Sequence, residues 1–141
     1  QLSGITHITR KLSLYYQGVY GYGYGEYLNG LSDEGFDLIP DPETQGKLYA
    51  PETLGYVAGL QYAFSPKFFI SASYSQSRVY SKQGALSPES YRYAQYIVGN
   101  AFYNLTTDCS IGIEYLYGRR SNLNRQDGEA NRINTMIRYN F

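Results

Sequence analysis

The sequence predicts an all-β fold, namely an antiparallel transmembrane β-barrel segment with about six long strands and a remnant of a further strand. The composition is the first observation, because 18 of the 141 residues are Tyr and 15 are Gly. Tyr suits a pleated, half-buried surface, whereas Gly weakens helices. The second is an alternation of apolar and polar residues with a period of 2, sustained over runs longer than the roughly five or six residues of a typical globular strand.

The alternation places the strands in chain order. Residues 1–8 have the character of the end of an earlier strand. The long strands are predicted at residues 12–28, 53–64, 68–80, 91–104, 109–120 and 131–141. In 91–104 the phase of the alternation is ambiguous, and we assign Arg92 and Asn100 to the polar side. The last strand is the most regular: Ile133, Thr135, Ile137, Tyr139 and Phe141 share one face, and Arg132, Asn134, Met136, Arg138 and Asn140 share the other.

The connections between these strands alternate in length. Tight turns are predicted at 9–11, 65–67 and 106–108, and longer polar loops at 31–52, 81–90 and 121–130. A tilted strand that spans a bilayer needs about 9–11 residues, and barrels of the outer-membrane type have short turns at one end and long loops at the other. We therefore expect the tight turns on the periplasmic side and the long loops outside.

The polar face of the predicted strands carries Arg, Glu, Asn, Ser and Gly, which suit a wet lumen. A soluble carbohydrate-binding β-sandwich, with Tyr rings as stacking platforms, is an alternative because its strands also alternate. Such a sandwich would have a poor core here, since Leu, Ile and Val together make up only 26 of the 141 residues, while 18 are Tyr. A second alternative is a structural or adhesive outer-membrane barrel that displays its loops without transport.

Charge and composition exclude other classes. Lys and Arg number 12 and Asp and Glu number 12, so the net charge is zero and gives no bulk attraction for nucleic acid. The absence of an apolar run near the roughly 20 residues of a spanning helix excludes a helical membrane protein. Neither a Ser-His-Asp set nor a carboxylate pair has support from spacing, so we expect no enzymatic activity, cofactor or metal site. The acidic loop at 31–52 is interpreted as solvated, with a divalent cation as the minor alternative.

Three stretches resemble the DcaP-like family of trimeric outer-membrane porins. They are the glycine-rich run 20–29, the run 112–120, and the last strand, from Ala130-Asn131-Arg132-Ile133 to Arg138-Tyr139-Asn140-Phe141. The resemblance is to the C-terminal portion of such a porin. It implies a homotrimer in the bacterial outer membrane, in contact with its lipid, that passes small polar or anionic solutes such as dicarboxylates by passive diffusion.

The end of the sequence adds a further signal. The terminal aromatic Phe141, on an amphipathic last strand, resembles the signal by which the barrel-assembly machinery recognises outer-membrane proteins. A barrel closed by one chain needs about eight strands, and an open edge is not viable in lipid. We therefore expect residues 1–141 to be a single-domain, C-terminal part of a larger porin, with closure by several chains as the alternative.

Six residues are the candidates to line the pore: Asn100, Glu114, Arg120, Arg132, Asn134 and Arg138. Guanidinium groups in a wet lumen hold carboxylates in bidentate geometry, so the three arginines are expected to favour anions. They are expected as a ladder, with Arg138 near the periplasmic end and the other two flanking the last outer loop. Pairing of one arginine with Glu114 across the hairpin is an equal alternative. The alternating glycines of 20–25 either admit a constriction loop against the wall or are wall positions that need no side chain.

Overall fold

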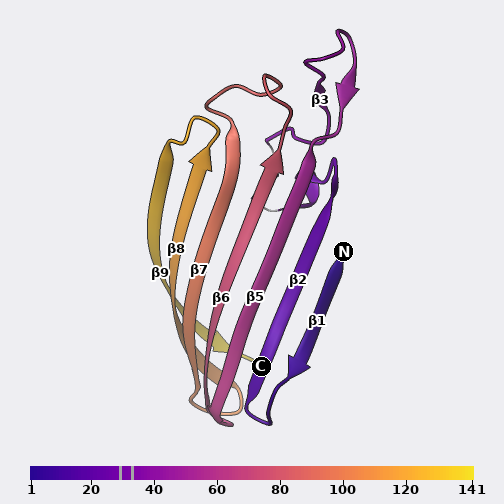
Figure 1. The fold of residues 1–141 in the computed structure, drawn as a ribbon. Coiled ribbons are helices and arrows are strands. Elements are labelled where there is room, and N and C mark those ends of the chain that lie inside the picture. Colours follow the sequence, from indigo (N-terminus) through magenta and orange to yellow (C-terminus); the bar gives the residue numbers. More distant parts are fainter. Residues whose placement is uncertain (29, 33) are drawn as a thin grey trace.

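Seven strands, in chain order, form one antiparallel sheet, and two short strands form a separate two-stranded sheet (Figure 1). A computed structural model describes residues 1–28, 30–32 and 34–141. The seven strands are β1 (Leu2–His7), β2 (Leu12–Tyr22), β5 (Glu52–Ser65), β6 (Phe68–Tyr80), β7 (Tyr91–Asn104), β8 (Cys109–Asn122) and β9 (Asp127–Tyr139). The sheet is open, with β1 and β9 as its edges. The predicted class, six long strands and a remnant of a barrel wall, is confirmed.

The three short turns lie at one end of the sheet and share one local design (Figure 1). In each, a Ser or Thr hydroxyl oxygen accepts a hydrogen bond from the first backbone N–H of the next strand. Thr9 accepts from Leu12 at 3.0 Å, and Ser65 accepts from Phe68 at 3.1 Å. Thr106 likewise accepts from the N–H of Cys109 at 3.0 Å. This side-chain capping closes the turns without glycine, and it is readable in the sequence.

The connection between β2 and β5 differs from the prediction. The second strand ends at Tyr22, not near residue 28, because Gly23 adopts a positive φ of 67° that a strand does not allow. A 3₁₀ turn, η1 (Gly25–Tyr27), follows. Farther on, the two short strands β3 (Ile39–Pro40) and β4 (Leu48–Tyr49) form a small hairpin beyond the main sheet.

The last hairpin also differs from the prediction. The loop expected at 121–130 is confined to residues 123–126, since β8 and β9 remain paired up to Ser121 and Asp127. Arg119 and Asp127 form an ion pair at this end of the hairpin. Polar residues that resemble a loop in composition thus extend the strands.

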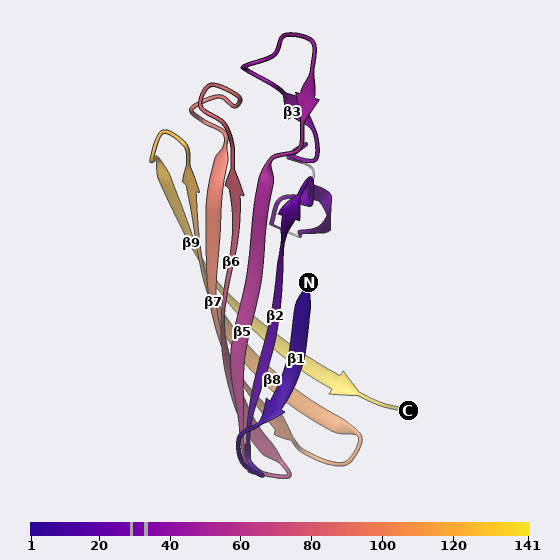
Figure 2. The same cartoon turned by 45° about the vertical axis from the view of Figure 1, so that its right-hand side comes forward.

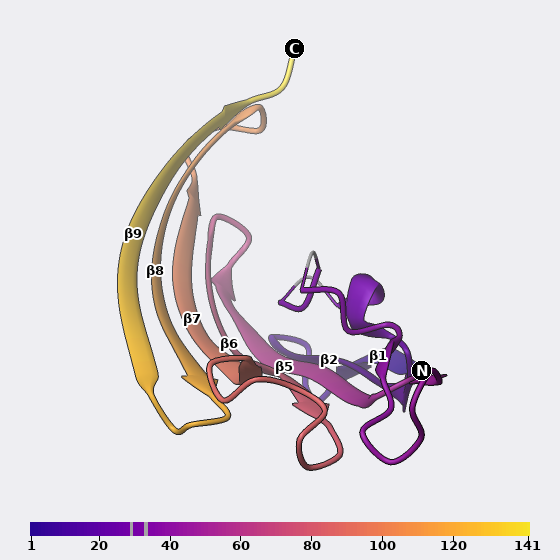
Figure 3. The same cartoon turned by 90° about the horizontal axis from the view of Figure 1, so that it is seen from above.

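The sheet is strongly curved, as views from the side and from above show (Figures 2 and 3). The pairing register places the residues predicted to be polar, apart from Arg92, on one face, and the β2–β5 connection contacts this face at Gly55 and Ser77. This face is the concave one, because the segment that contains η1 lies on the concave side (Figure 3). The pairing register explains the ambiguous phase of the fourth long strand: a bulge between Tyr91 and Tyr93 shifts the alternation within β7, with Arg92 as the extra residue. Asn100 lies on the concave face, opposite Glu114.

Below its long-loop end, the convex face is apolar and largely uncovered. Ile113 is 54% exposed and Ile137 is 81% exposed. Aromatic rings gather at its short-turn end, where Phe64 stacks on Phe68 at 5.2 Å and Tyr139 meets Phe141 at 5.1 Å between ring centres. An apolar band edged by aromatic residues is the surface that a lipid-facing barrel wall presents. In residues 1–28, 30–32 and 34–141, no helix is both long enough and apolar enough to cross a bilayer.

Buried apolar residues gather where the β2–β5 connection meets the sheet. The cluster consists of Leu31, Phe36, Ile39, Val79, Tyr91 and Ala94. Three of these come from the connection and three from β6 and β7. The best-buried side chains therefore fix the β2–β5 connection to the seven-stranded sheet. Over the rest of this sheet, the described residues form no second layer. This single curved sheet excludes the sandwich architecture considered as an alternative.

Candidate functional site

A polar row crosses the concave face on all seven strands. The pairing register places its members side by side, in the order His7, Ser13, Gln61, Ser71, Asn100, Glu114 and Asn134. Several are hydrogen-bonded to their neighbours: His7 Nδ1 lies 2.9 Å from the Ser13 hydroxyl, and the Ser71 hydroxyl donates to Asn100 Oδ1 at 2.5 Å. An unbroken row of this kind suits a wall that faces water, because a packed core would leave these groups without water as a partner.

Three of the predicted pore-lining residues are neighbours in this row. Asn134 Nδ2 donates to Glu114 Oε1 at 2.9 Å, and Asn100 is the register partner of Glu114 on the other side. Glu114 thus takes a neutral amide as its partner. The four ion pairs found among the described residues do not include Glu114, so the alternative of an arginine paired with it is not what the structure shows.

The three predicted arginines all lie on the concave face but at different heights. Arg138 is opposite Ser110, close to the short-turn end, and its Nε donates to Asn140 Oδ1 at 3.1 Å. Arg132 is opposite Leu116 and donates to Asn134 Oδ1 at 2.7 Å. It therefore lies beside the polar row at mid-height, not at the last outer loop, because β9 begins four residues before the predicted start. Arg120 is opposite Gly128, near the long-loop end.

The β2–β5 connection folds over the upper part of the concave face. Gly55 makes room for it, since a Cβ at this position would lie 2.4 Å from Leu28 Cδ2. Gly30 approaches β6 in the same way, with its Cβ position 2.6 Å from the Ser77 hydroxyl. Gly21 instead accommodates the Tyr24 ring of the connection itself. Bare glycine positions therefore admit the loop against the wall, but they are Gly55 and Gly30 and not the alternating glycines of 20–25. The second strand ends at Tyr22, so Gly23 and Gly25 belong to the connection itself.

Polar contacts anchor this loop to the wall. Arg120 Nη1 donates to Glu34 Oε1 at 2.8 Å, and the Arg120 guanidinium carbon lies 5.1 Å from the centre of the Tyr91 ring. The Tyr91 hydroxyl donates to the carbonyl of Ser77 at 3.0 Å, while the ring contacts Phe36 at 6.3 Å between centres. Arg120, predicted as a pore residue, is thus also a tether for the loop. Nothing in the sequence spacing indicates that Glu34 or Tyr91 takes part.

A second tether holds the β3–β4 hairpin. Lys82 Nζ bonds to Asp41 Oδ1 at 3.1 Å and to Glu43 Oε2 at 2.7 Å. The Glu43 backbone N–H and then Lys82 lower the pKa of Asp41, while Glu43 and Asp41 raise the pKa of Lys82. Asp41 and Glu43 thus serve as anchors, and no cluster of metal-ligating side chains occurs among the described residues. Asp33 lies outside the described residues.

A cavity of about 440 Å³ remains between the loop and the wall. Its lining includes Gln17, Tyr27, Leu28, Val57, Ser75 and Tyr96. Hydroxyl, amide and aromatic groups thus alternate with apolar ones, and no residue of the lining is charged. The concave face therefore has a narrowed, neutral upper zone under the loop and a zone below it that contains Arg132, Glu114 and Arg138.

A curved antiparallel sheet with an apolar convex face, a polar concave face and a loop folded onto the concave side defines a segment of a porin-type β-barrel. A comparison with solved structures finds the outer membrane channel DcaP of Acinetobacter baumannii, with a TM-score of 0.82 and 18% sequence identity. The match covers 99% of this chain and 39% of the channel, so this chain spans about two fifths of that protein's length. The DcaP-like resemblance of the sequence is confirmed for the fold, and the coverage fits the expected C-terminal portion. No protein-family model and no curated protein sequence matches the chain.

Proposed function

We propose that this chain forms part of the wall of a bacterial outer-membrane porin that passes small polar or anionic solutes, such as dicarboxylates, by passive diffusion. The observation that carries the proposal is the joint placement of the polar row and the loop on the concave face. A hydrated wall with a loop folded against it is the arrangement of a water-filled pore with a constriction.

The charges of the concave face support a preference for anions. Arg132 and Arg138 have only neutral asparagine partners among the described residues, whereas Arg120 is balanced by Glu34. Guanidinium groups without a carboxylate partner keep donors free for a passing carboxylate. Glu114 opposes this effect at mid-height. Weak, repeated sites of this kind allow a solute to leave as well as to enter.

The open sheet bears on the closure of the barrel. Both edges, β1 and β9, need pairing partners in lipid. We propose that further strands of a larger single-domain barrel supply them, that the protein assembles as a homotrimer in contact with outer-membrane lipid, and that the barrel-assembly machinery recognises the strand ending at Phe141. The likeness of the fold to an outer membrane channel supports a porin with no enzymatic role.

The test is the reversal potential of the complete protein in planar bilayers under a salt gradient. Anion preference is expected, and it should weaken when Arg120, Arg132 and Arg138 are changed to Gln. Added salt should also weaken it, because the Debye length is about 8 Å at physiological ionic strength. Arg78→Gln, which removes a charge from the convex face, is the control and should leave the reversal potential unchanged.

An absence of conductance would contradict the porin and favour the structural or adhesive barrel. Conductance whose anion preference survives the triple change would preserve the porin but refute the role of the three arginines.

A further inference from the structure

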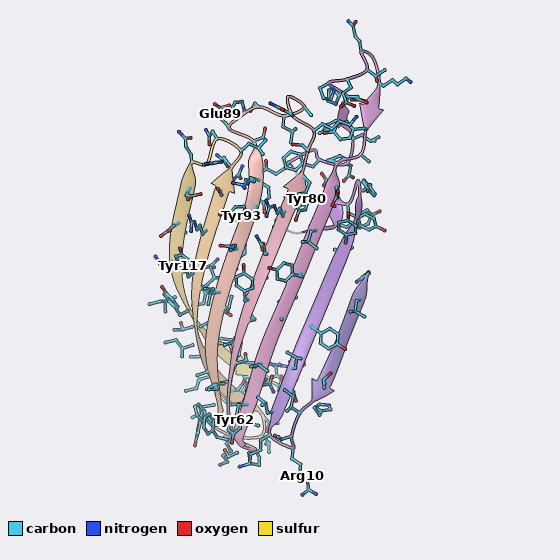
Figure 4. All side chains as sticks on the ribbon, viewed as in Figure 1. Arg10, Tyr62, Tyr80, Glu89, Tyr93 and Tyr117 are labelled. Carbon is cyan, nitrogen blue, oxygen red and sulfur yellow. The ribbon has the colours of Figure 1, made fainter. Side chains whose placement is uncertain are left out.

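The convex face carries a second set of arginines that the pore does not use. Arg78, Arg92 and Arg119 come from the long-loop ends of β6, β7 and β8 and surround Tyr93; we refer to these three residues as the basic cluster. Arg78 is the register partner of Tyr93, and Arg119 is the partner of Gln95 on the next strand. Figure 4 shows Tyr93 and Tyr80 in the upper part of the sheet, far from Tyr62 and Arg10 at the short-turn end.

Two of the three guanidinium groups lie against the same tyrosine ring. The guanidinium carbon of Arg78 is 4.8 Å from the ring centre of Tyr80 and 5.9 Å from that of Tyr93. The corresponding carbon of Arg92 is 5.7 Å from the Tyr93 centre. Contacts with the faces of aromatic rings orient the cations but leave their hydrogen-bond donors unused.

Among the described residues, only one ion pair reaches the basic cluster, although Glu129 is the register partner of Arg119. Neither Arg78 nor Arg92 forms an ion pair with any described residue, and Arg78 Nε is shielded from solvent without a hydrogen-bond partner. Arg119 is paired with Asp127, yet its own Nε is also shielded and unpartnered. Nearby on β5, Glu52 accepts a hydrogen bond from the Tyr20 hydroxyl at 2.6 Å. Partly buried cations without acceptors are costly, which points to an anion that is supplied from outside the chain.

The height of the cluster indicates which anion can reach it. Arg78 lies ten residues along β6 from Phe68, and Arg119 lies ten residues along β8 from Cys109. At about 3.3 Å per residue and a strand tilt of about 40°, this distance is about 25 Å of depth, equal to the apolar band of an outer-membrane barrel. The aromatic residues around Phe68 mark one edge of the band, so the basic cluster lies at the other edge, at the level of lipid headgroups.

We propose that the basic cluster binds a phosphate group of an outer-leaflet lipid headgroup. Arginine matches phosphate in bidentate geometry, and Arg78 and Arg92, which both contact the Tyr93 ring, offer such donors on their terminal nitrogens. One phosphate would supply the acceptors that Arg78 and Arg92 lack. The inference rests on the proposed membrane location of the barrel, but not on which solute the pore passes.

The experiment compares lipids that differ only in phosphate. The complete protein in a mild detergent is titrated with lipid A, with dephosphorylated lipid A and with inorganic phosphate, and binding is followed by native mass spectrometry and by the shift in melting temperature. Phosphorylated lipid A should bind and raise the melting temperature. The double variant Arg78→Gln/Arg92→Gln should bind it at least about tenfold more weakly, since it loses charged hydrogen bonds to the phosphate.

Arg10→Gln, at the opposite end of the sheet, is the matched control and should bind like the unchanged protein. If the double variant does not fold, Arg92→Gln at the bulge alone should still weaken binding. Equal binding of dephosphorylated lipid A, or undiminished binding by the folded variants, would overturn the site. The same shift with inorganic phosphate alone would overturn its assignment to lipid. Because the cluster lies outside the pore, the variants should retain conductance, and so this test fails or succeeds separately from that of the porin.

Discussion

Replacement of Ile113 by Arg should destabilise the protein far more than replacement of Asn134 by Arg. Ile113 lies on the convex face, four residues along β8 from Cys109. At about 3.3 Å per residue and about 40° of tilt, it lies about 10 Å inside an apolar band that is about 25 Å tall. An arginine near the midplane costs about 2–4 kcal/mol. Ile137 lies only two residues from Tyr139, so the same change there should cost less.

Asn134 offers the matched position on the concave face. Its side chain is hydrogen-bonded to Glu114, the register partner that lies next to Ile113 in β8. An arginine there faces water and can pair with the Glu114 carboxylate, so the cost should stay below about 1 kcal/mol. The assay is denaturant unfolding of the complete protein in lipid vesicles. An equal loss in the free energy of unfolding for the two variants would refute either the assignment of the faces or the location of the protein in a membrane.

Two further predictions concern the loop that lies on the wall. Arg120→Gln should weaken the attachment of the loop to the wall by about 1 kcal/mol at most, because the ion pair with Glu34 is partly exposed. In single-channel recordings, the current through the variant should fluctuate about fivefold more often. The charge swap Arg120→Glu/Glu34→Arg should restore a steady current, whereas additive defects of the two changes would contradict the tether. The lowered pKa of Asp41 means that its stabilising contacts are present above the ordinary value of 3.8 and are lost as the pH falls through the folded-state pKa. A protease should therefore cleave the β3–β4 hairpin faster in acid, and it should cleave the hairpin of the Lys82→Gln variant readily already at neutral pH. A cleavage rate of the unchanged protein that does not depend on pH would contradict the role of Asp41.

The strands that the sequence predicted best each have a capped short turn at one end, before β6 and after β7. Residues 68–80 and 91–104 match β6 and β7 in both bounds. The alternation identifies their interior, and the Ser or Thr hydroxyl that caps each short turn marks where the next strand begins. Both signals act within a few residues of one another, so they do not depend on the rest of the fold.

The errors arose where composition and conformation disagree. The segment 127–130 has the polarity of a loop, yet it is paired with β8 because strand pairing, above the apolar band, tolerates polar side chains on both faces. Conversely, the alternating Tyr and Gly of 20–25 continue the pattern of a strand, but Gly23 turns the chain away from the sheet. The bulge at Arg92 is a shift between partners, and a single strand's pattern cannot fix it.

For the candidate site too, the sequence predicted some features and only the structure decided others. Asn100, Glu114 and Asn134 were assigned to one polar face by alternation alone, but their alignment in one row is a matter of register between strands. The tether between Arg120 and Glu34 joins residues 86 positions apart, and the basic cluster brings three strands together. The sequence by itself determined the two faces and the turns, because backbone pleating imposes a period of 2 on every strand. Only the tertiary structure decided that the loop lies on the concave wall and which charges it neutralises, because those contacts depend on register, on curvature and on glycine positions that leave room between distant segments.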